Sequence, residues 1–191
     1  MMKFELNLER LKKDAETMAI NPNDSFFISY REFLNYFEKT DTIDFSSMVI
    51  GIHFTYSWMP TIFDFRSNEF SEVIVILNKV KRNLEINSED CIVLKENFNN
   101  SLVGTSKLLH FINPLEYAIW DSRVFRYIFN KNPYQYHLSD PENFLSYLKM
   151  CKEITNSNSF KEIHEIVITK VGYDITKMRS LELIMYSLGG K

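Results

Sequence analysis

The sequence predicts an all-α fold, and three observations support that prediction. Apolar residues recur at three- and four-residue steps along most of the chain, which is the period of an amphipathic helix. Gly and Pro are scarce, with 5 of each among 191 residues, so a turn-rich β-sandwich and a Gly-rich nucleotide-binding fold are disfavoured. Hydrophobic residues make up 45% of the chain, which is enough to form a core. We expect one helical domain over residues 1–191, or two fused helical lobes, with about eight to ten helices.

Capping and breaking residues place the helices of the first half. Asp24 or Ser25 would cap the second helix, and Asp44 would cap the third, which Pro60 ends or kinks. The predicted helices cover residues 7–20, 26–39, 48–58, 68–83 and 88–98.

The second half follows the same rules. Pro114 stops one helix, and Asp140 followed by Pro141 is a typical helix start. The predicted helices cover residues 106–111, 121–128, 141–154, 160–171 and 177–188. The β-branched run at 166–169 could instead form a strand, so a strand pair over 160–176 is the main alternative to this prediction.

Charge and cysteine content limit the classes of partner. The formal net charge is −3 and the pI about 5.8, which is unfavourable for binding phosphates unless basic residues cluster locally. Cys91 and Cys151 are too few for a disulfide framework, a four-thiolate zinc site or an iron–sulfur cluster. No pair of His, Asp or Glu residues has metal-ligand spacing, so we expect neither a metal nor a cofactor.

The chain shows no sign of export or membrane insertion. Its start, Met1-Met2-Lys3-Phe4-Glu5, turns charged at once and lacks the apolar region of a signal peptide. The longest apolar stretch, 46–65, contains His53, Pro60 and Asp64 and is too polar to span a bilayer. Together with free thiols, this predicts a cytoplasmic protein with no membrane partner.

The segment 100–128 carries the most chemical information. It reads as a helix, a tight turn, a second helix, a Pro break, a short apolar stretch and a third helix. Gly104 would give the turn a left-handed conformation, so that backbone N–H groups could face an anion. Lys107 would fall in the first turn of the second helix, where the helix dipole disfavours a cation. A negative group nearby, either Asp121 or a phosphate, would explain that position. Asp121 would cap the third helix, with backbone donors holding its carboxylate.

The ordered features of this segment are Val103-Gly104, Lys107, Pro114, Ala118-Ile119-Trp120 and Asp121-Ser122-Arg123-Val124-Phe125-Arg126. They resemble the helix-hairpin-helix DNA glycosylase superfamily, and most closely its bacterial 8-oxoguanine-glycosylase-like branch. In that superfamily a V-G-x-x-K hairpin precedes a helix, a Pro-containing turn and an apolar run that ends in D-T-H-I-F-R. Met178-Arg179-Ser180-Leu181-Glu182 is also reminiscent of the bacterial branch. Asn100-Ser101-Leu102 stands where the superfamily has L-P-G.

The resemblance implies a mechanism. The protein would bind duplex DNA, flip a damaged, oxidised base out of the stack and remove it. Lys107, with its pKa lowered by desolvation, would attack the sugar carbon and form a Schiff base. Asp121 would stabilise the sugar cation or activate the nucleophile. If Lys107 were out of position, Asp121 could still direct a water molecule, as in a glycosylase without lyase activity.

The resemblance also implies contacts with DNA. Hairpin N–H groups would hold a backbone phosphate, and aromatic side chains would grip the flipped base. The residues expected to contact DNA are Val103, Gly104, Thr105, Ser106, Arg123 and Arg126. The residues expected to line the base pocket are Tyr56, Trp58 and Phe63.

The same residues have simpler interpretations. Asp121 can be an N-cap and nothing more, Lys107 a solvated surface lysine, and Gly104 a plain turn residue. Trp120 and the aromatic residues Tyr56, Trp58 and Phe63 can be part of the core. The basic residues can be scattered surface charges, unless they converge on the face that carries Gly104; they are Lys79, Lys81, Arg82, Lys95, Arg123, Arg126 and Lys131.

Two other functions therefore stay open. One is a non-catalytic helical domain of the same ancestry that binds DNA or a protein. The other is a helical interaction module with no nucleic-acid role. A glycosylase should bring Lys107 and Asp121 together beside an open cleft, whereas a DNA-binding relic would keep a basic face and misdirect Lys107. An interaction module would expose an apolar patch and have no basic groove.

Overall fold

A computed structural model describes residues 2–59, 61–65 and 69–190 of the protein. Within those residues the chain is all-α, as predicted, and its β-structure is limited to one isolated bridge between Phe65 and Phe98. The helices described are α1 (Leu8–Thr17), α2 (Ser25–Glu38), α3 (Phe45–Trp58), α4 (Ser71–Lys81), α5 (Ser88–Asn97), α6 (Leu102–Ile112), α7 (Ser122–Phe129), α8 (Gln135–Ser139), α9 (Pro141–Asn156), α10 (Phe160–Val171) and α11 (Lys177–Leu188).

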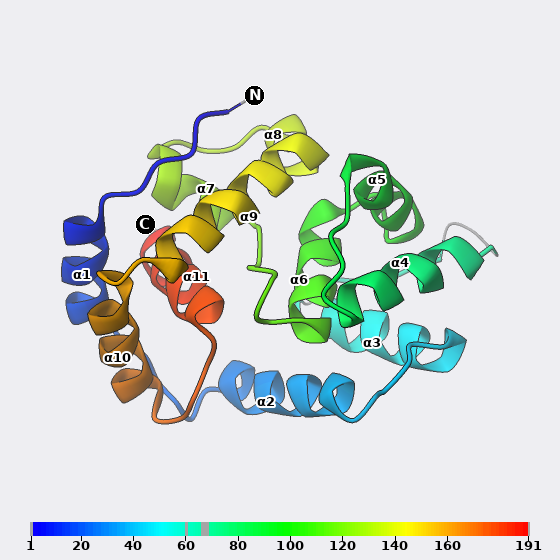
Figure 1. Ribbon diagram of the computed structural model, residues 1–191, viewed down its shortest axis with the longest axis horizontal. Helices are drawn as coiled ribbons and strands as arrows, with labels where there is room; N and C mark the ends of the chain where they lie inside the picture. Colours follow the sequence, from blue (N-terminus) through cyan, green and yellow to red (C-terminus); the bar gives the residue numbers. More distant parts are fainter. Residues whose placement is uncertain (1, 60, 66–68, 191) are drawn as a thin grey trace.

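The helices form two groups that lie side by side. Figure 1 shows α3–α6 on one side and α7, α9, α10 and α11 on the other, with α2 running along the lower edge between them. The N-terminal helix α1 packs against α10 and α11, so the chain begins and ends in the same group. The link between the groups runs from α6 through the loop that contains Asp121 into α7.

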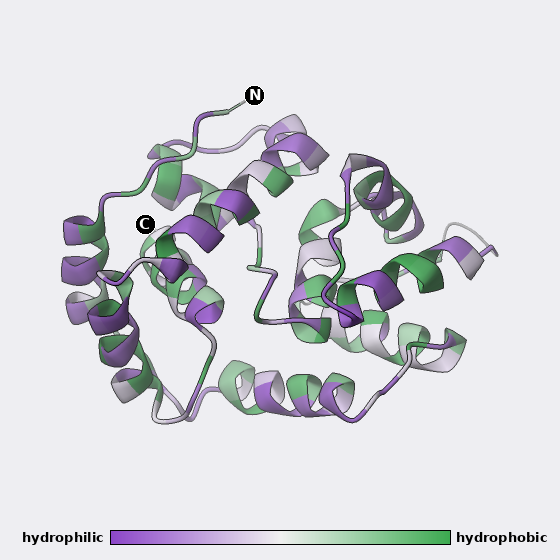
Figure 2. Ribbon diagram, viewed as in Figure 1, coloured by the Kyte–Doolittle hydropathy of each residue, from purple (hydrophilic) through white to green (hydrophobic). Residues whose placement is uncertain are grey.

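Helix α6 is the centre of the first group. Every residue from Leu102 to Ile112 except Val103 is buried, and the helix packs against α2, α3, α4 and α5. The outer helices are amphipathic instead. Figure 2 shows hydrophilic and hydrophobic residues on different sides of α1 and α2, as expected for helices that cover a core.

Most predicted helix starts are confirmed by side-chain caps. The carboxylates of Asp24, Asp44 and Asp140 accept hydrogen bonds from the backbone N–H groups of Phe26, Ser47 and Glu142, respectively. Helices α10 and α11 have the predicted limits, and the run at 166–169 is helical. The sequence did not predict the short helix α8, which brings the described helices to eleven. The predicted break at Pro60 and the predicted helix start at Asn68 lie outside the described residues.

The predicted turn around Gly104 is wrong. Gly104 lies inside α6, and Gly172 is the glycine with positive φ among the described residues. The left-handed residues that reverse the chain between α5 and α6 are Asn99 and Asn100, with φ of 55° and 52°. Asn tolerates this conformation better than other residues with a side chain. Because α6 starts three residues earlier than Thr105, Lys107 lies in its second turn and not in its first.

Candidate active site

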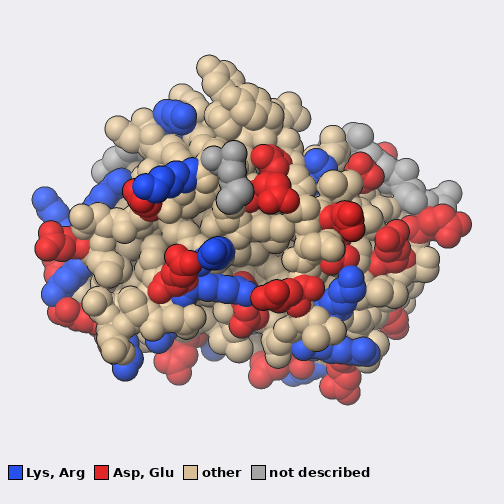
Figure 3. Space-filling view, turned by 45° about the horizontal axis from the view of Figure 1, so that its top comes forward, with Lys and Arg blue, Asp and Glu red and all other residues tan. Residues whose placement is uncertain are grey.

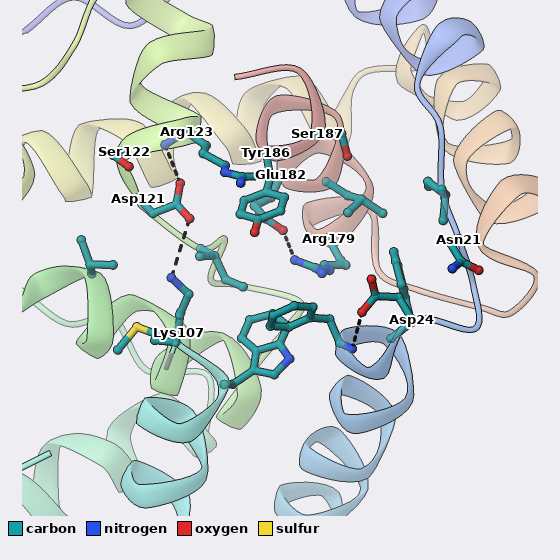
Figure 4. A pocket seen from close by; sticks show the side chains of 18 of the residues that line it. Asn21, Asp24, Lys107, Asp121, Ser122, Arg123, Arg179, Glu182, Tyr186 and Ser187 are labelled. Atoms are coloured by element: carbon teal, nitrogen blue, oxygen red, sulfur yellow. Dashed lines mark hydrogen bonds and ion pairs between the residues drawn. The ribbon is translucent and has the colours of Figure 1, made fainter. Parts of the chain in front are cut away.

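Lys107 and Asp121 face each other across the link between the two groups. The Nζ atom of Lys107 lies 3.7 Å from Oδ2 of Asp121, and each side chain is only 11% exposed. The other carboxylate oxygen of Asp121 accepts hydrogen bonds from the backbone N–H groups of Arg123 (2.9 Å) and Val124 (3.0 Å), which cap α7. Figure 4 shows both side chains converging from α6 and from the start of α7. Lys107 is therefore not a solvated surface lysine, and the cap leaves one oxygen of Asp121 for the cavity.

Ser106 brings the two residues together. It precedes Lys107, and its hydroxyl accepts a hydrogen bond from the backbone N–H of Trp120 at 3.0 Å, while its oxygen lies 3.2 Å from the Trp120 carbonyl. Trp120 precedes Asp121 in the chain. The Ser106 side chain and the Trp120 backbone thus join α6 to the loop, directly beside Lys107 and Asp121 in the chain.

A cavity of about 860 Å³ opens beside this pair. Its walls come from the start of α2, the end of α3, the side of α6 that carries Val103 and Lys107, the Asp121 loop and α11 (Figure 4). Lys107, Asp121 and Trp58 belong to the lining, with Phe26 and Tyr186 as further aromatic walls. The cavity is large enough for a planar heterocycle with its sugar, and its lining mixes aromatic faces with a few charged groups.

A second buried ion pair shares the cavity. Arg179 and Glu182, one turn apart on α11, are joined by a hydrogen bond, and both line the cavity. The guanidinium of Arg179 lies 4.6 Å from the ring centre of Tyr30 and 5.8 Å from that of Trp58. Sequence reasoning did not select this pair as site residues. The signal was present, since two opposite charges three residues apart stand among apolar neighbours of α11.

Burial shifts the pKa of one member of each charged pair, Lys107 and Glu182. It lowers the pKa of Lys107, and the carboxylates of Asp121 and Glu182 oppose that shift. Burial also raises the pKa of Glu182 to about 7, with Arg179 acting in the opposite direction. In the cavity, the neutral amine of Lys107 and the neutral acid of Glu182 are therefore both more accessible than they would be in water.

Arg179 rests on a buried hydrogen-bonded chain. The Tyr30 hydroxyl lies 2.9 Å from Nε2 of His110, and Nδ1 of His110 lies 2.6 Å from the Tyr117 carbonyl oxygen. A carbonyl can only accept, so Nδ1 carries the proton and Nε2 accepts from Tyr30. Burial lowers the pKa of His110 to about 3, which keeps the imidazole neutral. This histidine is a satisfied core residue that fixes the ring beneath Arg179.

Of the three residues predicted for the base pocket, Trp58 lines the cavity. Tyr56 is buried beside it and donates a hydrogen bond from its hydroxyl to the Phe98 carbonyl oxygen at 2.7 Å. Phe63 packs on Tyr56, with ring centres 4.8 Å apart, and is absent from the cavity lining. Tyr56 borders a smaller adjoining hollow of about 460 Å³.

The predicted DNA contacts fall into two sets. Gly104, Thr105 and Ser106 are buried within α6, and the Gly104 N–H donates to the Ser101 hydroxyl at 3.1 Å. Their surroundings explain why these residues are small, and they do not face solvent as a phosphate contact must. Val103 is half-buried and lines the cavity.

Arg123 and Arg126 behave differently from each other. Arg123 is exposed at the cavity mouth, with its guanidinium 4.5 Å from the ring centre of Tyr186. Arg126 is half-buried and donates from Nε to the Gly189 carbonyl oxygen at 2.7 Å. Arg123 is thus the predicted arginine that keeps its guanidinium at the mouth.

The remaining basic residues do not gather into one patch. Lys79 pairs with Asp90 at 2.9 Å, Lys81 donates to the Phe37 carbonyl oxygen, and Lys95 donates to the carbonyl oxygen of Ser139. Figure 3 shows basic and acidic side chains interspersed over the face that it presents. On that face the basic residues do not form a continuous patch.

Metal and membrane features are likewise not found in the described part of the chain. No three His, Cys, Asp or Glu residues there could hold a metal ion, and Cys91 and Cys151 are separate buried thiols. No helix among the described residues is long and apolar enough to cross a membrane.

Comparison with protein-family models, curated proteins and solved structures gives no significant match to the chain.

Proposed function

We propose that the protein is a DNA glycosylase that removes a damaged, oxidised base and uses Lys107 as its nucleophile. One observation carries this proposal: the Lys107 amine and the Asp121 carboxylate lie 3.7 Å apart in the wall of a cavity of about 860 Å³. Desolvation favours the neutral, nucleophilic form of a lysine amine, and a carboxylate beside it can stabilise positive charge on the sugar. The α5–turn–α6 sequence followed by Asp121 supports the resemblance of residues 100–128 to helix-hairpin-helix glycosylases.

The geometry gives each residue a role. The neutral amine of Lys107 would attack the sugar carbon that carries the base, and the base would leave with the electrons of its bond to that carbon. One proton lost by the amine would go to the departing base. The bond from the sugar carbon to the ring oxygen would then break, the ring oxygen would take a second proton, and the opened sugar would remain on Lys107 as a Schiff base. The oxygen of Asp121 that faces Lys107 is placed to stabilise positive charge on the sugar, because the other oxygen is held by α7.

Recognition would take place at the mouth and the walls. Arg123, exposed at the rim, is placed to contact a DNA phosphate. The Trp58 ring lines the wall, where a flipped base could stack.

Borohydride trapping on lesion-containing duplex oligonucleotides tests the proposal. We expect the wild-type protein to form a covalent adduct with at least one oxidised-base duplex. Lys107→Ala should abolish the adduct, and Asp121→Asn should lower its rate of formation by about a hundredfold or more.

Matched controls separate chemistry from folding. Lys131→Ala removes an exposed lysine, and Asp140→Asn alters a carboxylate that caps a helix away from the cavity lining. Both controls should trap like the wild type. No adduct and no base release on any oxidised-base duplex would refute the proposal, as would an undiminished adduct in Lys107→Ala.

A second candidate function is a helical interaction module that binds a protein and has no nucleic-acid role. It is favoured by the interspersed surface charge of Figure 3 and by exposed apolar side chains such as Ile28 and Leu115. Under this function a partner would bind, and Lys107→Ala would leave its affinity unchanged.

A further inference from the structure

Four charged side chains line the same cavity. Lys107 comes from α6, Asp121 from the start of α7, and Arg179 and Glu182 from α11; all four residues are buried. Their formal charges cancel, so a proton can move among them without charging the buried site. Such a move would cost far less than adding a net charge to the interior.

The two carboxylates differ in what holds them. One oxygen of Asp121 is bound to two backbone N–H groups of α7, which the folded helix keeps in place. Glu182 is held by a single side chain, Arg179, which is itself fixed over the ring of Tyr30. Glu182 is therefore the carboxylate whose charge can change without opening a helix end.

We propose that Glu182 is a positioning residue that governs the charge of Lys107: as a carboxylate it keeps the amine protonated, and as the neutral acid it leaves the amine free to attack. In the exchange one N–H bond of Lys107 breaks and one O–H bond of Glu182 forms. Asp121 and Arg179 keep their charges, so the total charge of the cavity wall is unchanged. The catalytic consequence rests on the proposed function, whereas the coupling between the two side chains does not.

The other titratable groups facing Glu182 cannot take its place. Burial raises the pKa of Tyr30 on α2, of Tyr147 and Cys151 on α9, and of Tyr186 on α11, so these groups stay neutral. Burial raises the pKa of Glu182 only to about 7, which makes both of its forms accessible near neutral pH.

The reactivity of Lys107 towards limiting acetic anhydride tests the inference without DNA. The acetylation rate of Lys107 is measured by peptide mass spectrometry between about pH 5 and pH 10 and normalised to that of the exposed Lys131. Glu182→Gln mimics the neutral acid and removes a negative charge. We expect it to shift the midpoint of the Lys107 curve downward by about one pH unit, or about tenfold faster acetylation below the midpoint.

Two further variants show that charge, and not shape, is responsible. Glu182→Asp restores a carboxylate and should return the curve towards that of the wild type. Glu116→Gln removes a surface carboxylate that pairs with Lys152 and should leave the Lys107 curve unchanged. A Lys107 curve that is the same in Glu182→Gln as in the wild type would overturn the inference.

A paired substitution covers the case in which Glu182→Gln does not fold. Arg179→Met with Glu182→Met replaces the buried ion pair by apolar side chains, which buried pairs often tolerate. It should still lower the Lys107 midpoint, because Glu182 acts on Lys107 more strongly than Arg179 does. An unshifted midpoint in this folded variant would overturn the inference equally.

The two proposals fail separately. A shifted Lys107 curve without any DNA adduct would support the coupling and refute the glycosylase. An adduct with an unshifted curve would support the glycosylase and refute the role of Glu182.

Discussion

At the scale of single residues, Ser106 explains why Lys107 and Asp121 meet although they are distant in sequence. Its hydroxyl forms a buried hydrogen bond with the backbone of Trp120. Lys107 directly follows Ser106 in the chain, and Asp121 directly follows Trp120. The resemblance of residues 100–128 predicted Lys107 and Asp121 as a pair, and the cap at Asp121 was a local signal. The first-turn position expected for Lys107 was wrong, because α6 begins at Leu102. The resemblance also assigned Ser106 to DNA, because a hydrogen bond across the fold leaves no local pattern.

The same limit applies to Arg179 and Glu182. Their spacing on α11 can be read from the sequence, but their position beside Lys107 depends on how α11 packs against the α7 side of the cavity. Sequence spacing shows which residues share a helix face and not which helices face each other. The ion pair therefore became a candidate only in the folded chain.

His110 makes a residue-scale prediction about pH. Its pKa falls from 6.5 to about 3 on folding, so it adds stability above pH 6.5 that is lost as the pH falls towards 3. Between about pH 7 and pH 4, wild-type stability should fall by about 2–3 kcal/mol more than that of His110→Gln. Urea unfolding at each pH measures the difference. Equal acid losses in the two proteins would show that His110 is not held neutral.

At the scale of elements, α6 depends on how closely α3 can approach it. A Cβ atom on Gly104 would lie 2.5 Å from the hydroxyl oxygen of Tyr56, a buried residue of α3. The sequence identified Gly104 as special but predicted the wrong reason, since Gly signals both positive φ and close packing. The residues with positive φ are Asn99 and Asn100. Two consecutive Asn residues are a sequence signal for this conformation, because Asn adopts it more readily than most residues.

Gly104→Ala should therefore destabilise the protein. We expect a loss of about 1–3 kcal/mol in the free energy of unfolding, because the ring of Tyr56 must move. Ser46→Ala, at an exposed position of α3, is a control that should change stability by less than about 0.5 kcal/mol. The alternative prediction, a left-handed turn at Gly104, would be supported if Gly104→Asn were tolerated better than Gly104→Ala.

At the scale of the whole molecule, the cavity exists because two groups of helices meet at α6, α11 and the Asp121 loop. Periodicity and capping residues predicted every described helix except α8, and both limits of α10 and α11, because these signals lie within each segment. They could not place α1 with the C-terminal helices, an arrangement that only long-range packing determines (Figure 1). We propose that the Lys107 amine at this meeting point is uncommonly reactive.

Mapping the DNA attachment site tests that claim most directly. The borohydride-trapped protein–DNA adduct is digested, and the modified peptide is sequenced by mass spectrometry. We expect the sugar remnant to be attached to Nζ of Lys107. Attachment to the N-terminal amine or to any other lysine would contradict that claim.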